Sequence, residues 1–155
     1  MHPTGRCGVV ITDQNRSLCT ELGAANHYKL EHLKQPSIWN NVFNKLQIYF
    51  VGGYHLTVCP EAALALAKEA AAQNKVFAMS LSAPFIPTAF KDALDQTEPY
   101  WDYLVGNENE AQAWAEAHNL EVYFPVLQTQ AYNINLKEDQ GYSYHCTAHS
   151  AATKS

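Results

Sequence analysis

Short apolar runs alternate with amphipathic or alanine-rich stretches along the middle of the chain. The apolar runs are rich in β-branched and aromatic residues and predict three strands, at 47–52, 76–81 and 103–105. The stretches between and after them predict three helices, at 60–74, 87–96 and 107–118. Strands that alternate with crossover helices predict an α/β fold of the three-layer αβα type, with a mainly parallel sheet covered by helices on both faces.

Capping signals place the helix boundaries more closely. Pro60 and Glu61 are typical of a first helical turn, and Asn74 is a suitable residue to end the same helix. The stretch 30–46 predicts a helix in two pieces, broken at Pro36, with Ser37 as the N-cap of the second piece.

The N-terminal residues predict a β-hairpin. The runs 7–12 and 17–22 have strand character, and the turn-forming residues Asp13, Gln14 and Asn15 separate them. Arg16 follows this turn directly, so it stands at the mouth of the hairpin. The expected fold therefore includes a small lid-type β-hairpin beside the α/β body.

Residues 121–155 break the pattern. They show little periodicity, many polar residues and no alternation of strand and helix. We therefore divide the chain into a partial α/β domain at 1–120 and a non-homologous tail at 121–155 that is expected to be disordered. The tail contains His145, Cys146 and His149, but it lacks the paired spacing of a structural zinc site, so we expect no metal there.

Composition limits the classes of function. A length of 155 residues, 47% of them hydrophobic, allows one modest core. A net charge of −5 and a pI of about 5.7, with no cluster of Lys or Arg, argue against nucleic acid and anionic membranes as partners. The sequence shows neither a signal peptide nor a membrane-spanning run, and its four cysteines form no Cys-x-x-Cys pair. We expect reduced thiols and a location in the cytoplasm, with the nucleus as a further compartment.

The junction 102–110 is the most informative segment. An apolar strand stops at Gly106, and a helix rich in carboxylates begins at Asn107. Such junctions hold phosphates and magnesium in α/β enzymes, where Glu110 would offer a hard oxygen ligand. The same residues also fit a capping box, in which Asn107 and Glu110 satisfy free helix amides and bind nothing else. Local sequence leaves both interpretations open.

Four segments in fixed order identify a resemblance to a family. They are Thr12-Asp13-Gln14-Asn15-Arg16-Ser17-Leu18, Gly52-Gly53-Tyr54-His55-Leu56-Thr57, Ser80-Leu81-Ser82-Ala83-Pro84-Phe85-Ile86 and Gly106-Asn107-Glu108-Asn109-Glu110. Together they resemble the ribokinase (PfkB) family of sugar and nucleoside kinases, over about residues 3–120. The resemblance implies a ribokinase-like fold and phosphoryl transfer from ATP to adenosine, in purine salvage. The segments 15–18 and 81–85 favour adenosine over a sugar as the substrate.

The resemblance also implies roles for individual residues. Arg16 corresponds to an arginine that reaches over the substrate and the transferring phosphate, although an idle surface arginine fits the local pattern as well. Leu18, Leu22 and Tyr54 match positions that wall the adenosine pocket, although each leucine alone also fits an ordinary core. Asn107 and Glu110 match the pair that organises Mg²⁺, which is the implied cofactor together with ATP as co-substrate. The parent enzyme is expected to be a monomer.

Two family elements have no counterpart in these residues. One is the N-terminal segment with its nucleoside-binding Asn and Asp, and the other is the later Gly-Ala-Gly-Asp element with the catalytic Asp. We therefore assign no catalytic residue and expect this truncated chain to be inactive alone. Two alternatives remain: a catalytically dead fragment that binds a nucleoside or a partner, and, with less support, a sugar kinase of the same family.

Overall fold

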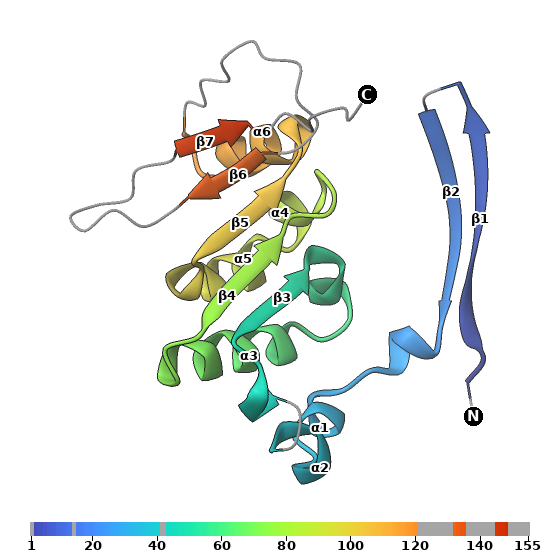
Figure 1. The fold of residues 1–155 in the computed structure, drawn as a ribbon. Helices are drawn as coiled ribbons and strands as arrows, with labels where there is room; N and C mark the ends of the chain where they lie inside the picture. Colours follow the sequence, from blue (N-terminus) through green and yellow to red (C-terminus); the bar gives the residue numbers. More distant parts are fainter. Residues whose placement is uncertain (1, 14, 41–42, 121–131, 136–144, 149–155) are drawn as a thin grey trace, which may run out of the picture.

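The computed structural model describes residues 2–13, 15–40, 43–120, 132–135 and 145–148. These residues form a two-stranded hairpin and a five-stranded sheet with helices packed against it (Figure 1). In the larger sheet the strand order is β3-β4-β5-β6-β7, which places the strands in the order of the sequence.

Three parallel strands make up the centre of the fold. They are β3 (Ile48–Gly52), β4 (Val76–Ser80) and β5 (Tyr103–Gly106). β3 pairs with β4 in parallel, and β4 pairs with β5 in parallel. The predicted strands and their parallel arrangement are therefore confirmed, and their carboxyl ends lie at one edge of the sheet. Two strands from the C-terminal part, β6 (Tyr132–Asn135) and β7 (His145–Ala148), continue the sheet in antiparallel direction.

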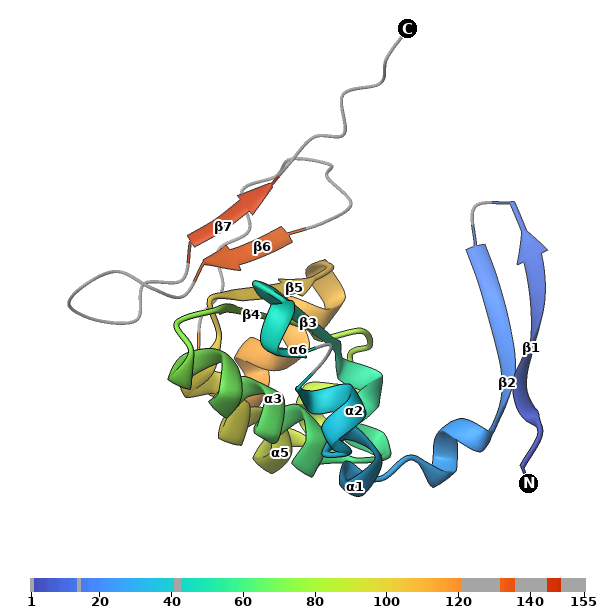
Figure 2. The ribbon, with the colours of Figure 1, turned by 60° about the horizontal axis from the view of Figure 1, so that its bottom comes forward.

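The longer helices cross between the parallel strands. α3 (Pro60–Ala72) joins β3 to β4, and Asn74 follows its C-cap Gln73 with a left-handed φ of 52°, as is common just past a helix end. α4 (Ile86–Ala89) and α5 (Lys91–Thr97) join β4 to β5, and α6 (Glu108–Ala117) follows β5. Figure 2 shows these helices together beneath the sheet.

The core lies between this helical layer and the sheet. Phe77, Met79 and Leu104 point from the strands into it and are fully buried, and Trp114 of α6 and Leu94 of α5 meet them from the helices. Alanines of α3 allow close approach to the sheet, because Ala63, Ala67 and Ala70 are all fully buried there.

The opposite face of the parallel strands is open among the described residues. Strand pairing places Ile48, Phe50, Ala78 and Tyr103 on that face, and of these four only the small Ala78 is buried. Ile48 is 62% exposed and Phe50 63% exposed, although both are large and apolar. The α/β architecture with a parallel sheet is thus present, and the described helices cover one of its two faces.

The predicted hairpin is confirmed and is longer than expected. β1 (Thr4–Thr12) pairs antiparallel with β2 (Asn15–Gly23). In Figures 1 and 2 the hairpin stands apart from the body of the molecule. A short 3₁₀ helix, Ala24–His27, connects it to α1 (Leu30–Leu33) and α2 (Pro36–Trp39).

Two local predictions are wrong in detail. Ser37 is not an N-cap, because the second helical piece begins with Pro36 itself at N1 and Gln35 occupies the cap position. The helix predicted at 87–96 is interrupted at Phe90, which has a non-helical backbone and separates α4 from α5. Most of the segment 121–155, including the predicted tail residue His149, lies outside the described residues, and its two described stretches are the strands β6 and β7.

No helix among the described residues has the length and apolar character that a membrane crossing requires.

Candidate active site

The carboxyl ends of β3 and β4 are tied together by one hydrogen bond. The backbone N–H of Gly53, just after β3, donates to Oγ of Ser82 at 2.9 Å, and Ser82 Oγ in turn donates to Ser80 Oγ at 3.2 Å. Ser82 has a left-handed backbone with φ of 65°, which turns the chain away from the end of β4. The loops after both strands are therefore fixed relative to each other.

Gly53 is required by this close approach. A Cβ at Gly53 would lie 2.5 Å from the Leu81 carbonyl oxygen and 2.6 Å from that of Ser80. Gly52 is different, because the nearest atom to a Cβ there is Ser82 Oγ at 3.8 Å, an ordinary contact. Gly53 therefore permits a close approach between the two loops, which a simple turn would not require.

The third strand end carries the reciprocal capping box. Asn107 Oδ1 accepts from the Glu110 backbone N–H at 2.9 Å, and Glu110 Oε2 accepts from the Asn107 backbone N–H at 3.1 Å. Asn107 Nδ2 also donates to Glu110 Oε1 at 3.0 Å. Gly106 makes room for this carboxylate, since a Cβ there would lie 3.3 Å from Glu110 Oε2. The capping interpretation is therefore confirmed as a structural fact.

The capping box leaves the Glu110 carboxylate able to accept further hydrogen bonds. Each carboxylate oxygen accepts one hydrogen bond here, and each has lone pairs for another. Glu110 is 8% exposed, so the carboxylate is buried at the strand end and held in a fixed orientation. A rigid acceptor of this kind fits a hydrated Mg²⁺, which keeps most of its water and needs few protein ligands.

An aromatic pair borders the same strand ends. Tyr54, in the 3₁₀ helix Gly53–Thr57 after β3, packs edge-on against Phe85, which precedes α4, with 5.8 Å between ring centroids. Tyr54 is 55% exposed and Phe85 is 45% exposed. Aromatic rings that remain this accessible at the end of a parallel sheet offer a stacking surface for a planar ligand. Phe85 lies within the segment 80–86 that carries the resemblance, but its local pattern does not distinguish a site residue from an ordinary aromatic.

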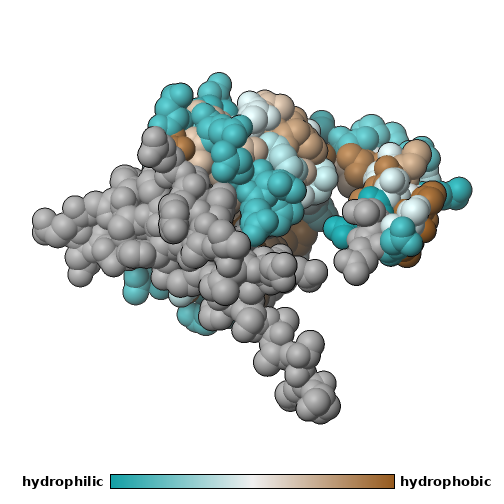
Figure 3. All heavy atoms as spheres, turned by 90° about the horizontal axis from the view of Figure 1, so that it is seen from above, coloured by the Kyte–Doolittle hydropathy of each residue, from teal (hydrophilic) through white to brown (hydrophobic). Residues whose placement is uncertain are grey.

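The three predicted site residues of the hairpin lie on one of its faces and not at the strand ends of the body. The register pairs Arg16 with Ile11 and Leu18 with Val9, so that Arg16, Leu18 and Leu22 share a face of the hairpin. Leu18 is 57% exposed and Leu22 41% exposed, and Figure 3 shows apolar side chains on the surface of the hairpin. The structure thus gathers Tyr54, Asn107 and Glu110 at the strand ends and places the other three predicted residues on a separate element.

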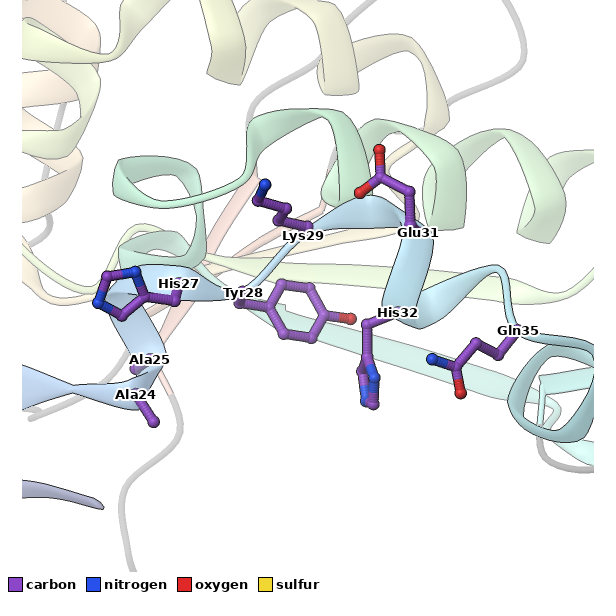
Figure 4. A pocket seen from close by; sticks show the side chains of 8 residues that line it. All are labelled: Ala24, Ala25, His27, Tyr28, Lys29, Glu31, His32 and Gln35. Atoms are coloured by element: carbon purple, nitrogen blue, oxygen red, sulfur yellow. The ribbon is translucent and has the colours of Figure 1, made fainter. Parts of the chain in front are cut away.

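The connection between hairpin and body contains a hollow that the sequence did not suggest. A cavity of about 690 Å³ is lined by Ala24, Ala25, His27, Tyr28, Lys29, Glu31, His32 and Gln35. In Figure 4, His27, Tyr28 and His32 lie along this segment, with the Tyr28 ring directed toward His32. The ring of His55 also packs edge-on against Tyr28, at 5.2 Å between centroids.

Burial alters the proton affinity of two groups there. Desolvation lowers the pKa of His55 below its usual value, so the neutral imidazole is favoured. Desolvation, reinforced by the nearby Cys59, raises the pKa of the Tyr28 hydroxyl. Both groups are therefore uncharged near neutral pH, which suits the packing between the connecting segment and α3.

Comparison with known proteins places the chain in a family. The family described as pfkB family carbohydrate kinase matches residues 1–134. The adenosine kinase of Schizosaccharomyces pombe is 49% identical over 121 residues, which cover 77% of this chain and 35% of that protein.

Solved structures agree with the sequence comparison. Anopheles gambiae adenosine kinase, in complex with P1,P4-di(adenosine-5) tetraphosphate, superposes with a TM-score of 0.72 at 45% identity, covering 76% of this chain and 35% of that one. Schistosoma mansoni adenosine kinase, in complex with 2-fluoroadenosine, gives a TM-score of 0.71 at 36% identity, covering 76% and 34% of the two chains. The chain therefore spans about a third of the length of the relatives that it matches.

Proposed function

The chain belongs to the pfkB family of carbohydrate kinases, and from this premise we propose that it forms part of an adenosine kinase. The proposed reaction transfers the terminal phosphoryl group of ATP to adenosine and yields AMP and ADP. Support comes from two relatives. The S. pombe adenosine kinase is 49% identical in sequence, and the A. gambiae adenosine kinase, whose structure is solved, is 45% identical.

One structural observation carries the proposal for the site. Three parallel strands end at the same edge, and each end is followed by a loop or cap that the sequence resemblance had marked: Tyr54 after β3, Ser82 after β4, and Asn107 with Glu110 after β5. In open α/β sheets the crevice at these ends is where ligands bind. An exposed aromatic pair and a rigid carboxylate supply the apolar and polar halves of a nucleotide-type site.

The apolar half is proposed to bind the purine. Tyr54, with Phe85 beside it, offers the stacking surface on the body. Leu18 and Leu22 present exposed apolar side chains on one face of the hairpin, where a bound base could cover them. Closure of that face over a bound nucleoside would bury both sets of side chains against the base.

The charged half is proposed to act on phosphate. Arg16 lies on the same face of the hairpin as Leu18, so the face that covers the base also carries a cation. A guanidinium has a planar set of donors that suits the charge spread over a transferring phosphoryl group. We propose that closure of the hairpin brings Arg16 to that group.

Asn107 and Glu110 are proposed to hold hydrated Mg²⁺ through water. Mg²⁺ would supply charge neutralisation on the polyphosphate of ATP, which is the usual co-substrate arrangement for phosphoryl transfer. The capping box orients the Glu110 carboxylate before any ligand arrives, because both its oxygens are fixed by Asn107. Such a preformed ligand costs no reorganisation when the ion binds.

A chimaera tests the proposed function. Residues 3–120 would replace the matching segment of the S. pombe adenosine kinase, and phosphorylation of adenosine, ribose and fructose would be measured with ATP. We expect activity on adenosine and none on the sugars. A folded chimaera that prefers a sugar would contradict the proposal.

The 155-residue chain alone provides the comparison. It contains no Gly-Ala-Gly-Asp sequence, and we expect it to convert no adenosine above the rate of its Glu110→Ala variant. Binding of adenosine to this inactive chain, measured by calorimetry and lost in Tyr54→Ala, would favour the alternative of a nucleoside-binding fragment.

A further inference from the structure

A second cluster of metal-binding side chains lies away from the strand ends, where α5 meets the end of α6. Asp95 belongs to α5, Glu98 follows in the next 3₁₀ helix, and His118 is the C-cap of α6. One ligand atom from each lies within 4.8 Å of the other two. The His118 side chain is 15% exposed and the Asp95 side chain 33% exposed, so the cluster is partly sheltered and open to solvent.

The orientation of His118 is fixed by the backbone of its own helix. Nδ1 lies 2.7 Å from the Trp114 carbonyl oxygen, which can only accept a hydrogen bond. Nδ1 must therefore carry the hydrogen, and in the neutral ring Nε2 carries the lone pair. A histidine that is anchored through Nδ1 to a carbonyl, with the lone pair on Nε2, has the orientation that is usual in a metal ligand.

Nε2 lies among groups that pair with positive charge, because a protonated His118 ring would donate to Asp95 and a neutral ring leaves two acceptors facing each other. It lies 2.8 Å from Asp95 Oδ1, and with a neutral ring both of these atoms are acceptors. The Lys91 ammonium lies 3.0 Å from Nε2 and also pairs with Asp95, so it is the positive charge that both acceptors share. Its side chain is 36% exposed and has a flexible stem, so it can turn into solvent at little cost.

We propose that Asp95, Glu98 and His118 bind a divalent transition-metal ion of the Zn²⁺ class, and that Lys91 competes with the ion for this position. One imidazole nitrogen and two carboxylate oxygens are the donors of a three-ligand tetrahedral site with an open fourth position. Mg²⁺ and Ca²⁺ fit less well, because both prefer an all-oxygen shell. Ligand atoms of a tetrahedral zinc site lie about 3.4 Å apart, so rotation of the half-exposed carboxylates completes the geometry.

Occupation would join two helices. Asp95 and Glu98 lie before β5, and His118 lies at the C-terminal end of α6, the helix that has Asn107 as its N-cap and Glu110 in its first turn. A bound ion would therefore fix α6 against α5, and the stability of the chain would rise with the logarithm of the ion concentration once this exceeds the dissociation constant.

Titration with Zn²⁺ and with Co²⁺, whose visible absorption reports its ligands, tests this proposal on the 155-residue chain. Because His145, Cys146 and His149 offer a competing donor cluster, all variants carry His145→Gln and His149→Gln. We expect one equivalent of metal to bind and the melting temperature to rise with Zn²⁺. His118→Ala and Glu98→Gln should each weaken binding at least about tenfold.

Two more variants complete the test. Lys91→Met should bind Zn²⁺ more tightly, because the competing cation is gone. Asp92→Asn, which removes an exposed carboxylate from the same helix, is the matched control and should bind as the parent does. Absence of binding, binding that survives both His118→Ala and Glu98→Gln unchanged, or equal affinity in Lys91→Met would overturn the proposal.

Discussion

The backbone N–H of Gly53 donates a 2.9 Å hydrogen bond to Oγ of Ser82, and this contact joins the loops that follow two neighbouring parallel strands. The two residues are 29 positions apart in the sequence. Their contact sets the distance between the Tyr54 loop and the Phe85 loop, and hence the spacing of the aromatic pair at the strand ends.

Gly53→Ala should destabilise the chain and Gly52→Ala should not. The added methyl at Gly53 would overlap two backbone carbonyl oxygens, and overpacking of this kind costs about 1–3 kcal/mol. A methyl at Gly52 would make only an ordinary contact, 3.8 Å from Ser82 Oγ. The Gly52 backbone has φ of −73°, which suits alanine. Urea denaturation of both variants measures the difference, and equal midpoints would contradict the close approach described for Gly53.

The free energy of unfolding should fall as the pH drops below about 6.5, because of His55. Burial lowers its pKa in the folded chain, so the unfolded chain takes up the proton first, and stability is lost from the unfolded pKa downward until the folded pKa is reached. Denaturation at several pH values between 5 and 7.5 measures the slope. His55→Phe should flatten this slope, and an unchanged slope would show that His55 is not its source.

The chain alone should self-associate through the open face of its sheet. Ile48, Phe50 and Tyr103 are exposed there, and β3 is an edge strand of the described sheet. Phe50→Glu should reduce the apparent mass measured by light scattering at high concentration. Gln96→Glu adds the same charge on the helical layer and is the matched control. A wild-type chain that stays monomeric at high concentration would refute this prediction.

Arg16→Lys in the chimaera should lower turnover of adenosine while leaving the fold intact. Lysine keeps the charge but loses the planar set of donors, so a clamp on the phosphoryl group weakens. Arg6→Lys, on the opposite face of the hairpin by its register, is the control and should behave as the parent. Kinetics of Arg16→Lys equal to those of the parent would assign Arg16 to the surface alone.

Much of the sheet could be predicted from the sequence because its signals are local. The strands at 48–52, 76–80 and 103–106 lie within a residue of their predicted bounds, since each apolar run is bounded by turn or capping residues. The capping box of Asn107 and Glu110 was one of two open interpretations, and its pattern of three-residue spacing is also local. Local pattern could not show the break at Phe90, because both halves of that stretch have helical character.

Contacts between segments that are distant along the chain could not be predicted from the sequence. The Gly53–Ser82 hydrogen bond and the cluster of Asp95 with His118 join residues from different elements, and no spacing rule relates them. The hairpin face that carries Arg16, Leu18 and Leu22 follows from the register of β1 and β2, but its position over a ligand depends on closure of the hairpin, which stands apart from the body.

Glu110→Gln in the chimaera tests the central claim most directly, because the capping box and the magnesium role predict different results. Glutamine can still accept from the Asn107 backbone N–H but cannot match both carboxylate contacts, which costs about 1–3 kcal/mol of stability. If Glu110 organises Mg²⁺, turnover should fall and half-maximal activity should shift to higher Mg²⁺, with the affinity for adenosine nearly unchanged. Wild-type turnover at the same Mg²⁺ concentration would contradict the account and leave Glu110 as a helix cap.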